Sequence, residues 1–461
     1  MKRLAALVLI TGCSVGPDYE PPKREAPAQW GQPADTSTAD LSKWWTVFND
    51  AALNRLVERA IGTNHDLRIA AARVEESRSE LAIARGYMLP EVNAGAEYTK
   101  SRVSANGQPF PNPQIYQSRY SLGFDAAWEI DIFGGGRRRM ESASADLDSW
   151  IENERAVLVT LLGDVARNYV AFRGNQLLLA VLRQNVTIAK GTVDITQSRL
   201  AAGVATSLDV TRSEALKSSA EAALPPVETA LKQTLHRLGV LLGLAPEALA
   251  AELEREAPIP SAPDRVVVGL PSELLLRRPD VRRAERRLAA QTASIGVAVA
   301  QLYPRLSLTG AFGLDSLGSA DLFKWSSREW SLGPTLRWPI FAAGRLQAQV
   351  EVEEARTKQA LAAYEQSMLV ALEDVENALV AYLREGDRRR MLEAAVAADK
   401  KAVELADDLY RKGLTSFIDV LDAQRALYLA QAELARSQAQ VTLELVALYK
   451  ALGGGWETKG N

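Results

Sequence analysis

A duplicated pattern runs along the 461-residue chain, and it limits the folds that the chain can adopt. The matching positions include these pairs, each 210 residues apart: Val170 and Val380, Gly203 and Gly413, Asp209 and Asp419, Leu242 and Leu452. Self-similarity at one spacing is the sequence sign of a repeated structural unit. We therefore expect two halves with the same fold, at residues 43–268 and 269–453, followed by a tail at 454–461.

Long helices are expected in both halves, because proline is absent from Gln114 to Leu224 and from Ile340 onward. The 64 residues from 137 to 200 would make about 96 Å of helix. Apolar residues seven apart predict coiled-coil packing in the second half: Val420, Leu427, Leu434, Val441 and Leu448. Each half should hold one helical hairpin, at 137–243 and 345–452, with tips at Gly203 and Gly413. Pro225-Pro226 should interrupt the first returning helix.

Two further segments alternate between apolar and polar residues, which predicts strands with one wet face. The alternation runs through residues 120–130 and 330–340, and partner strands precede each segment at 92–98 and 306–314. We therefore expect β-hairpins at 91–131 and 305–341, four strands in all. Such strands fit either a transmembrane barrel or an ordinary soluble sheet with one buried face. Four strands cannot close a barrel, but three chains could supply twelve.

The reactive residues are few. With two His and one Cys, the chain cannot build a His/Cys zinc site or a Cys/His dyad, and no phosphate-binding Gly-x-x-x-x-Gly-Lys motif is present. The net charge of -3 offers no basic excess for nucleic acid. We expect no enzyme activity, no cofactor and no metal site. A carboxylate hydrolase is the least favoured alternative, because no paired-carboxylate cleft is apparent.

The N-terminus resembles a bacterial lipoprotein signal. A basic start precedes an apolar run from Leu4 to Ile10, and small residues lead to Cys13, the only cysteine. The prediction is a signal peptide at 1–12 and a covalent lipid on Cys13, followed by an extended tether over 13–42 that is rich in proline. The alternative is an apolar N-terminus in which the cysteine is incidental.

Several motifs, in order, resemble the TolC-type outer-membrane efflux channels, in their lipoprotein branch. They are Gly16-Pro-Asp-Tyr after the cysteine, Trp44-Trp45-Thr-Val-Phe48-Asn-Asp50, the segment from Gly269 to Asp280, Tyr303-Pro304, and the segment from Tyr410 to Asp422. The resemblance covers residues 10 to about 453.

This resemblance implies an α+β membrane protein of Gram-negative bacteria. It implies a homotrimer whose 12-stranded transmembrane β-barrel, four strands per chain, is continued by a long α-helical coiled-coil barrel in the periplasm. The protein would be lipid-anchored in the outer membrane. It would be a passive exit duct for drugs or other small toxic compounds, which an inner-membrane pump delivers through a periplasmic adaptor. The alternative is a periplasmic coiled-coil adaptor or scaffold that never enters the membrane.

By residue match, the resemblance also assigns a gate at the hairpin tips. Asp419 and Asp422 correspond to a carboxylate constriction, with Asp209 as the first-half counterpart of Asp419. For each Asp the alternative role is helix capping after a glycine turn. Tyr410 matches a tyrosine that tethers the two hairpins, but Thr415 stands where the family has an arginine, so that the tether is absent or uses Arg411.

Aromatic residues near the ends of the predicted strands suggest a membrane-facing belt. Its members are Tyr98, Tyr120, Trp128, Trp330 and Trp338. Arginine runs at 282–287 and 388–390 and the acidic residues at 373–376 are read as solvated helix faces. Only five Met are present, which does not support a thioether relay for copper or silver.

Overall fold

The computed structural model describes residues 14–23, 26–33, 35–37, 40–102, 104, 116–261 and 266–459. Its contacts divide the chain into two compact units. Unit 1 comprises the residues up to Pro22, Arg73–Ile151 and Arg283–Glu365. Unit 2 comprises Lys23–Ala72, Glu152–Arg282 and the residues from Gln366 onward. Each unit therefore contains residues from both sequence repeats.

The secondary structure follows the expected division into long helices and a small sheet. Unit 1 holds β1 (Glu91–Arg102), β2 (Tyr116–Ile130), β3 (Arg305–Ser316), the short helix η2 (Trp325–Ser327) and β4 (Arg328–Arg337). Four helices contribute to both units: α2 (His65–Gly86), α3 (Gly135–Ala201), α8 (Pro279–Ala300) and α9 (Arg345–Arg411). Unit 2 adds η1 (Trp44–Phe48), α1 (Ala51–Thr63), α4 (Ser207–Ala222), α5 (Leu224–Leu241), α6 (Ala250–Leu253), α7 (Pro271–Arg277), α10 (Phe417–Ala451) and η3 (Trp456–Lys459).

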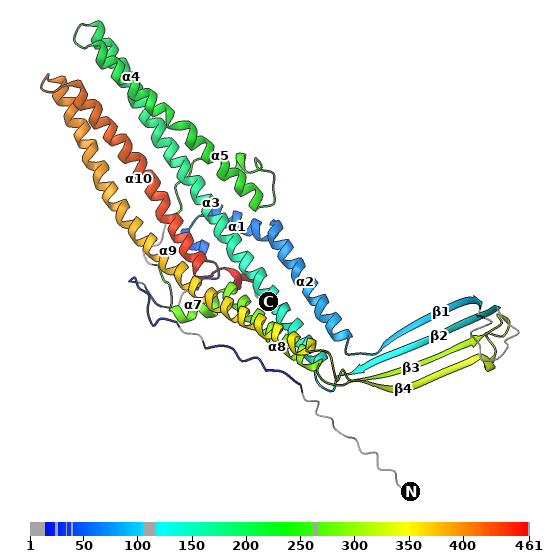
Figure 1. Cartoon of the computed structure of the whole chain (residues 1–461). Helices are drawn as coiled ribbons and strands as arrows, with labels where there is room; N and C mark the ends of the chain where they lie inside the picture. Colours follow the sequence, from blue (N-terminus) through cyan, green and yellow to red (C-terminus); the bar gives the residue numbers. More distant parts are fainter. Residues whose placement is uncertain are drawn as a thin grey trace. The chain divides into compact units, whose positions relative to one another are not determined.

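The sheet of unit 1 is antiparallel in the order β1-β2-β3-β4 (Figure 1), so the two expected hairpins join through β2 and β3. The register places like residues side by side: Ala94, Phe124, Phe312 and Trp330 form one row across the sheet, and Asn93, Asp125, Ala311 and Ser331 form the next. Because successive side chains point to opposite faces, one face is apolar and the other is polar.

The apolar face of the sheet is uncovered within the chain. Its large side chains remain mostly exposed, including Phe124 at 61%, Trp330 at 73% and Leu336 at 67%. The alternation expected to continue to Ile340 stops earlier, because β4 ends at Arg337. Pro339 has no amide hydrogen to donate to a neighbouring strand, which explains this earlier end.

In unit 2, α3 runs beside α4, and α9 runs beside α10 (Figure 1). Side-chain bonds join each pair, such as Gln197 to Glu214 at 3.4 Å and Arg388 to Glu433 at 2.5 Å. The first returning helix is interrupted at Ala223, and the two prolines lie in the first turn of α5, where a missing N–H is tolerated. In the second half, α10 continues without a break.

A cluster of large apolar side chains forms the core of unit 2. Trp44 stacks on Tyr449 with ring centroids 5.3 Å apart, and Phe48 meets the same tyrosine edge-on. The start of the chain's tail is also packed here, because Trp456 lies 4.6 Å from the guanidinium of Arg155 and 5.3 Å from that of Arg282. Among the described residues, no helix is both long enough and apolar enough to cross a membrane.

Candidate functional site

The tips of the two helical hairpins have the same backbone geometry. Gly203 and Gly413 both adopt φ of 72°, which favours glycine over any residue with a Cβ atom. In each turn the amide of the residue after the glycine donates to a carbonyl five residues earlier, from Val204 to Arg199 and from Leu414 to Leu409, both at 2.9 Å. These are helix ends of the Schellman type. The repeat has therefore preserved one turn twice.

Asp209 and Asp419 cap the helices that leave these turns. The carboxylate of Asp209 accepts from the backbone and hydroxyl of Thr206 at 2.9 and 2.8 Å. Asp419 accepts equivalent bonds from Ser416 at 3.1 and 2.8 Å, and also one from the hydroxyl of Thr415. The hydrogen bonds from Thr415 and Ser416 lower the pKa of Asp419. Capping is thus the role that the structure gives to both carboxylates.

Asp422 differs from these two residues. It lies one turn further into α10, is exposed, and has no hydrogen bond or ion pair among the described residues. Its carboxylate therefore keeps its full capacity to attract a cation. Of the three acidic residues assigned to the gate, only Asp422 has a charge that no local contact satisfies.

Tyr410 joins the two hairpins, but not through the partner that the sequence suggested. The guanidinium of Arg199, at the end of α3, lies 4.5 Å from the centre of the Tyr410 ring. The ring also packs against Phe417, with centroids 5.2 Å apart. The tyrosine hydroxyl has no hydrogen-bond partner in the described part of the chain. Arg411 pairs with Asp407 of its own helix at 2.7 Å, so it does not replace the missing family arginine.

Arg199 was missed at the sequence level because nothing in the repeat marks it. Its counterpart at an offset of 210 is Leu409, so the pattern of matching positions passes over it. A cation over an aromatic ring contributes about 0.5–2 kcal/mol. This contact links the end of α3 to the end of α9, and it is a candidate latch between the two tips.

Replacing Arg199 by leucine should loosen the tips, because the cation–π contact is lost while most of the side-chain packing remains. We expect the closed-state current in planar bilayers to rise several-fold, because the lost contact contributes about 1 kcal/mol to holding the tips together. Tyr410→Phe keeps the ring and should change the current little. The matched control is Arg183→Leu, which removes an exposed arginine of the same helix; among the described residues this arginine forms an ion pair with Glu228 alone, at 3.4 Å. Equal currents in Arg199→Leu and Arg183→Leu would argue against the latch.

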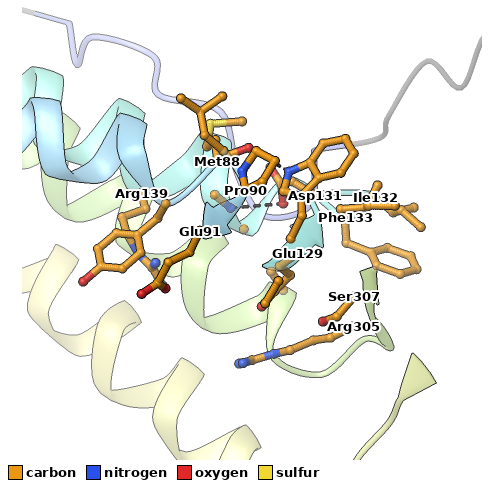
Figure 2. A pocket seen from close by; sticks show the side chains of 18 of the residues that line it. Met88, Pro90, Glu91, Glu129, Asp131, Ile132, Phe133, Arg139, Arg305 and Ser307 are labelled. Atoms are coloured by element: carbon orange, nitrogen blue, oxygen red, sulfur yellow. Dashed lines mark hydrogen bonds between the residues drawn. The ribbon is translucent and has the colours of Figure 1, made fainter. Parts of the chain in front are cut away.

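A second polar region lies where the strands of unit 1 meet its helices. A cavity of about 820 Å³ opens there, and Figure 2 shows Glu91, Glu129 and Arg305 among the side chains that line it. Asp131 caps α3 by accepting from the amides of Gly136 and Arg137, at 3.1 and 2.9 Å. No group of three or more metal-binding side chains occurs among the described residues.

The expected aromatic belt divides between the two ends of the sheet. Tyr98 and Tyr120 stack at one end, with ring centroids 4.8 Å apart, and Trp330 lies nearer to that end. At the helical end the indole N–H of Trp128 donates to the carbonyl of Met88 at 2.9 Å, and that of Trp338 donates to Leu302 at 3.1 Å. The two tryptophans thus make the same contact in the two repeats.

The predicted lipidation site, Cys13, lies outside the described residues, but the segment after it is firmly held. The amide of Val15 donates to Phe133 at 3.1 Å, and the buried guanidinium of Arg138 binds the carbonyls of Val15 and Gly16 and the carboxylate of Asp18. Further along, Trp30 and Gly31 also bond to the body of unit 2. The expected tether is therefore packed against the protein at two places.

Comparison with known proteins agrees with this architecture. The model of the outer membrane efflux protein family matches residues 56–244 and 270–454. The chain is 35% identical over 465 residues to the solvent efflux pump outer membrane protein SrpC of Pseudomonas putida, covering 99% of this chain and 98% of that protein. It is 36% identical over 444 residues to the pyoverdine export outer membrane protein OpmQ of the same species, covering 94% and 92%.

A solved structure is similar over nearly the whole chain. The outer-membrane channel OprN superposes with a TM-score of 0.90 at 35% identity, covering 96% of this chain and all of that one. These relatives are outer-membrane channels of efflux systems, so the alternative of a scaffold outside the membrane is not supported, and the family is one of transport ducts rather than of enzymes. The chain belongs to the outer membrane efflux protein family, the Gram-negative outer-membrane channels that form the exit ducts of tripartite efflux systems.

Proposed function

We propose that three copies of the chain assemble into one channel with a 12-stranded barrel. The observation that carries this proposal is the sheet: four strands with one exposed apolar face, in which the outer edges of β1 and β4 have no partner among the described residues. Unpaired edge strands and an uncovered apolar face are both unfavourable in a free chain. Pairing β4 of one copy with β1 of the next closes the edges, and lipid covers the apolar face.

In this assembly the two repeats, at 43–268 and 269–453, contribute equivalent parts of the wall. The polar face of the sheet lines the lumen. This face carries residues of opposite charge, such as Arg119 and Asp315, which form an ion pair at 2.5 Å. The long helices continue the wall as a coiled-coil barrel into the periplasm. The duct is passive, because its residues form a polar path and include no nucleotide-binding motif. Substrate arrives from an inner-membrane pump through a periplasmic adaptor.

The exported compound is a small toxic molecule, but the lumen does not identify it. The names of the two relatives above refer to a solvent and to pyoverdine. Ducts of similar sequence are therefore named for different exported compounds. We infer that the pump, rather than this channel, selects the substrate.

A ring of Asp422 carboxylates is proposed as the cation-selective constriction of the entrance. Three like charges about 6 Å apart in water repel one another by roughly 0.7 kcal/mol per pair, and they attract cations in return. Asp209 and Asp419 support the ring indirectly by holding the turns in shape.

Asp422→Asn should weaken the block of the channel by divalent cations in planar bilayers, because it removes the free carboxylates without changing size. We expect the concentration needed for half-block to rise about tenfold, since about 1.4 kcal/mol of binding corresponds to that factor. Asp407→Asn is the control, because Asp407 already pairs with Arg411 at 2.7 Å. Unchanged block in Asp422→Asn would remove this residue from the constriction.

We also propose that Cys13 carries the lipid anchor after removal of residues 1–12. The hydrogen bonds from the Arg138 guanidinium support this proposal, because they hold residues 15–18 beside the junction of β2 and α3 in unit 1. An acyl chain two residues away would then lie at a fixed position on the protein rather than on a loose tether.

Labelling with radioactive palmitate should mark the wild-type protein and leave Cys13→Ser unlabelled, because no other cysteine is present. Ser14→Ala, next to it, should label normally. Label in Cys13→Ser, or none in the wild type, would contradict the assignment.

A further inference from the structure

Polar residues lie between two apolar clusters where α3 packs against α10. We call this packing surface the seam. The cluster far from the tips contains Leu178, Leu179 and Leu182 of α3, Val227 of α5, and Ala432 and Ala435 of α10. The cluster near the tips contains Ala189 of α3, Leu216 of α4, and Phe417, Val420, Leu421 and Tyr428 of α10. Between the two clusters α3 presents Asn185 and α10 presents Gln431. The apolar core of this coiled coil is therefore not continuous.

A hydrogen bond fixes the register of this seam. The amide of Gln424 donates to the hydroxyl of Thr192 at 3.2 Å, which makes these two residues neighbours across α3 and α10. The helices run antiparallel, because Ala189 shares a cluster with Val420 and Leu182 shares one with Ala432. One heptad further from the tips, the residues facing each other are 185 and 431.

Several buried polar atoms at this position lack partners. Asn185 is only 2% exposed, and neither its amide nitrogen nor its amide oxygen has a hydrogen-bond partner among the described residues. The same holds for the side-chain oxygens of Gln424, Tyr428 and Gln431. Burial raises the pKa of Tyr428 to about 12, which agrees with a hydroxyl that nothing solvates. We call Asn185, Gln424, Tyr428 and Gln431 the polar layer; Tyr428 belongs at the same time to the apolar cluster near the tips.

One buried polar pair near the tips is satisfied. The hydroxyls of Thr196 and Ser213 lie 2.9 Å apart, so that one donates to the other, which in turn donates to a backbone carbonyl of its own helix. Polarity alone is thus not unusual in this bundle. What distinguishes the polar layer is that its groups would gain hydrogen bonds from water if α10 moved away from α3.

We propose that the polar layer is the release point of the gate: the place where the tip of the second hairpin separates from the first while the apolar seam behind it stays closed. A buried group without a partner weakens the packed state, whereas hydration restores its bonds in the separated state. The tip-side cluster and the Arg199–Tyr410 contact hold the tips closed, and the layer limits how strongly they do so. This inference rests on the proposed function, because it assumes that tip separation opens a duct.

The test is hydrogen–deuterium exchange, read by mass spectrometry, on the purified full-length protein. Tyr428→Phe removes only the buried hydroxyl, so the closed seam should become more stable. We expect the amides of residues 189–200 and 417–428 to exchange roughly tenfold more slowly, as expected for the loss of one unsatisfied buried group. Asn185→Leu, which fills the layer with an apolar side chain of similar size, should slow exchange in the same segments.

Tyr169→Phe is the matched control, because it makes the same chemical change at a satisfied hydroxyl. The hydroxyl of Tyr169 donates to Asp50 at 2.9 Å and accepts from Arg173 at 3.2 Å, so its loss should not slow exchange anywhere. Exchange that is unchanged or faster in both Tyr428→Phe and Asn185→Leu would overturn the proposal. A wild-type protein without bilayer current would instead contradict the proposed function, and slowed exchange in the variants would still support the polar layer.

Discussion

Replacing Phe312 by arginine is expected to keep the protein out of the outer membrane. Phe312 lies on the apolar face between Phe124 and Trp330, and 57% of its side chain is exposed. An arginine on the lipid face of a membrane barrel costs about 2–4 kcal/mol near the midplane. In the proposed trimer the substitution occurs three times, so the total cost is about 6–12 kcal/mol. The measurement is the amount of folded protein in the outer-membrane fraction.

The matched control is the neighbouring residue on the opposite face. Ala311 lies between Asp125 and Ser331 on the polar face, so that an arginine there would meet a carboxylate. We expect Ala311→Arg to reach the membrane at about the wild-type level. Equal amounts of folded Phe312→Arg and Ala311→Arg would show that the apolar face does not meet lipid.

Loss of Arg278 should strongly destabilise the protein. Its side chain is 10% exposed and binds Asp280 at 2.6 Å and Asp374 at 2.9 Å. It also donates to the carbonyls of Ala371 and Ala451, at 3.4 and 3.1 Å. Arg278→Met would leave the two buried carbonyls without this donor and the two partly exposed carboxylates without their cation, which costs about 1–3 kcal/mol. We expect a large fall in the thermal unfolding midpoint of the purified protein.

The control for this prediction is Arg388→Met. Arg388 also makes two ion pairs, with Glu385 and Glu433, but 46% of its side chain is exposed. Exposed pairs contribute about 0–1 kcal/mol, so the midpoint should change little. Similar midpoints for Arg278→Met and Arg388→Met would contradict the role given to the buried cluster.

The same cluster predicts a pH dependence. Burial raises the pKa of Asp280, but the hydrogen bond and charge of Arg278 outweigh it, so that the pKa lies below its usual value. A depressed carboxyl pKa stabilises the folded state above the ordinary value of about 3.9, and this stability is lost as the pH falls further. Between about pH 4 and pH 2, the free energy of unfolding of Arg278→Met should therefore fall less than that of the wild type.

The elements that could be predicted from the sequence are those with local signals. Alternation marked the strands, and the absence of proline marked the long helices, because both signals act through neighbours in the chain. The pairing of β2 with β3 could not be predicted, since it joins the two repeats and no local pattern specifies it. The docking of residues 15–18 on Arg138 was missed for the same reason.

The roles of the gate residues also could not all be predicted from the sequence. A carboxylate three residues after Ser416 fits both a capping box and a constriction, so sequence could not separate these roles for Asp419. The hydrogen bonds decide in favour of capping and leave Asp422 as the free charge. Arg199 and Tyr410 are 211 positions apart, and Asn185 looks like any polar helical residue until its neighbour across the seam is known. These assignments depend on contacts between helices that are far apart in the sequence.

The most direct test of the account is the current that the purified full-length protein carries in a planar lipid bilayer. We predict discrete conductance steps in the absence of nucleotide and of any pump, with a small current in the wild type and a larger one in Arg199→Leu. Protein that inserts into the bilayer and carries no current, in both the wild type and Arg199→Leu, would contradict the claim that this protein is a gated, passive duct.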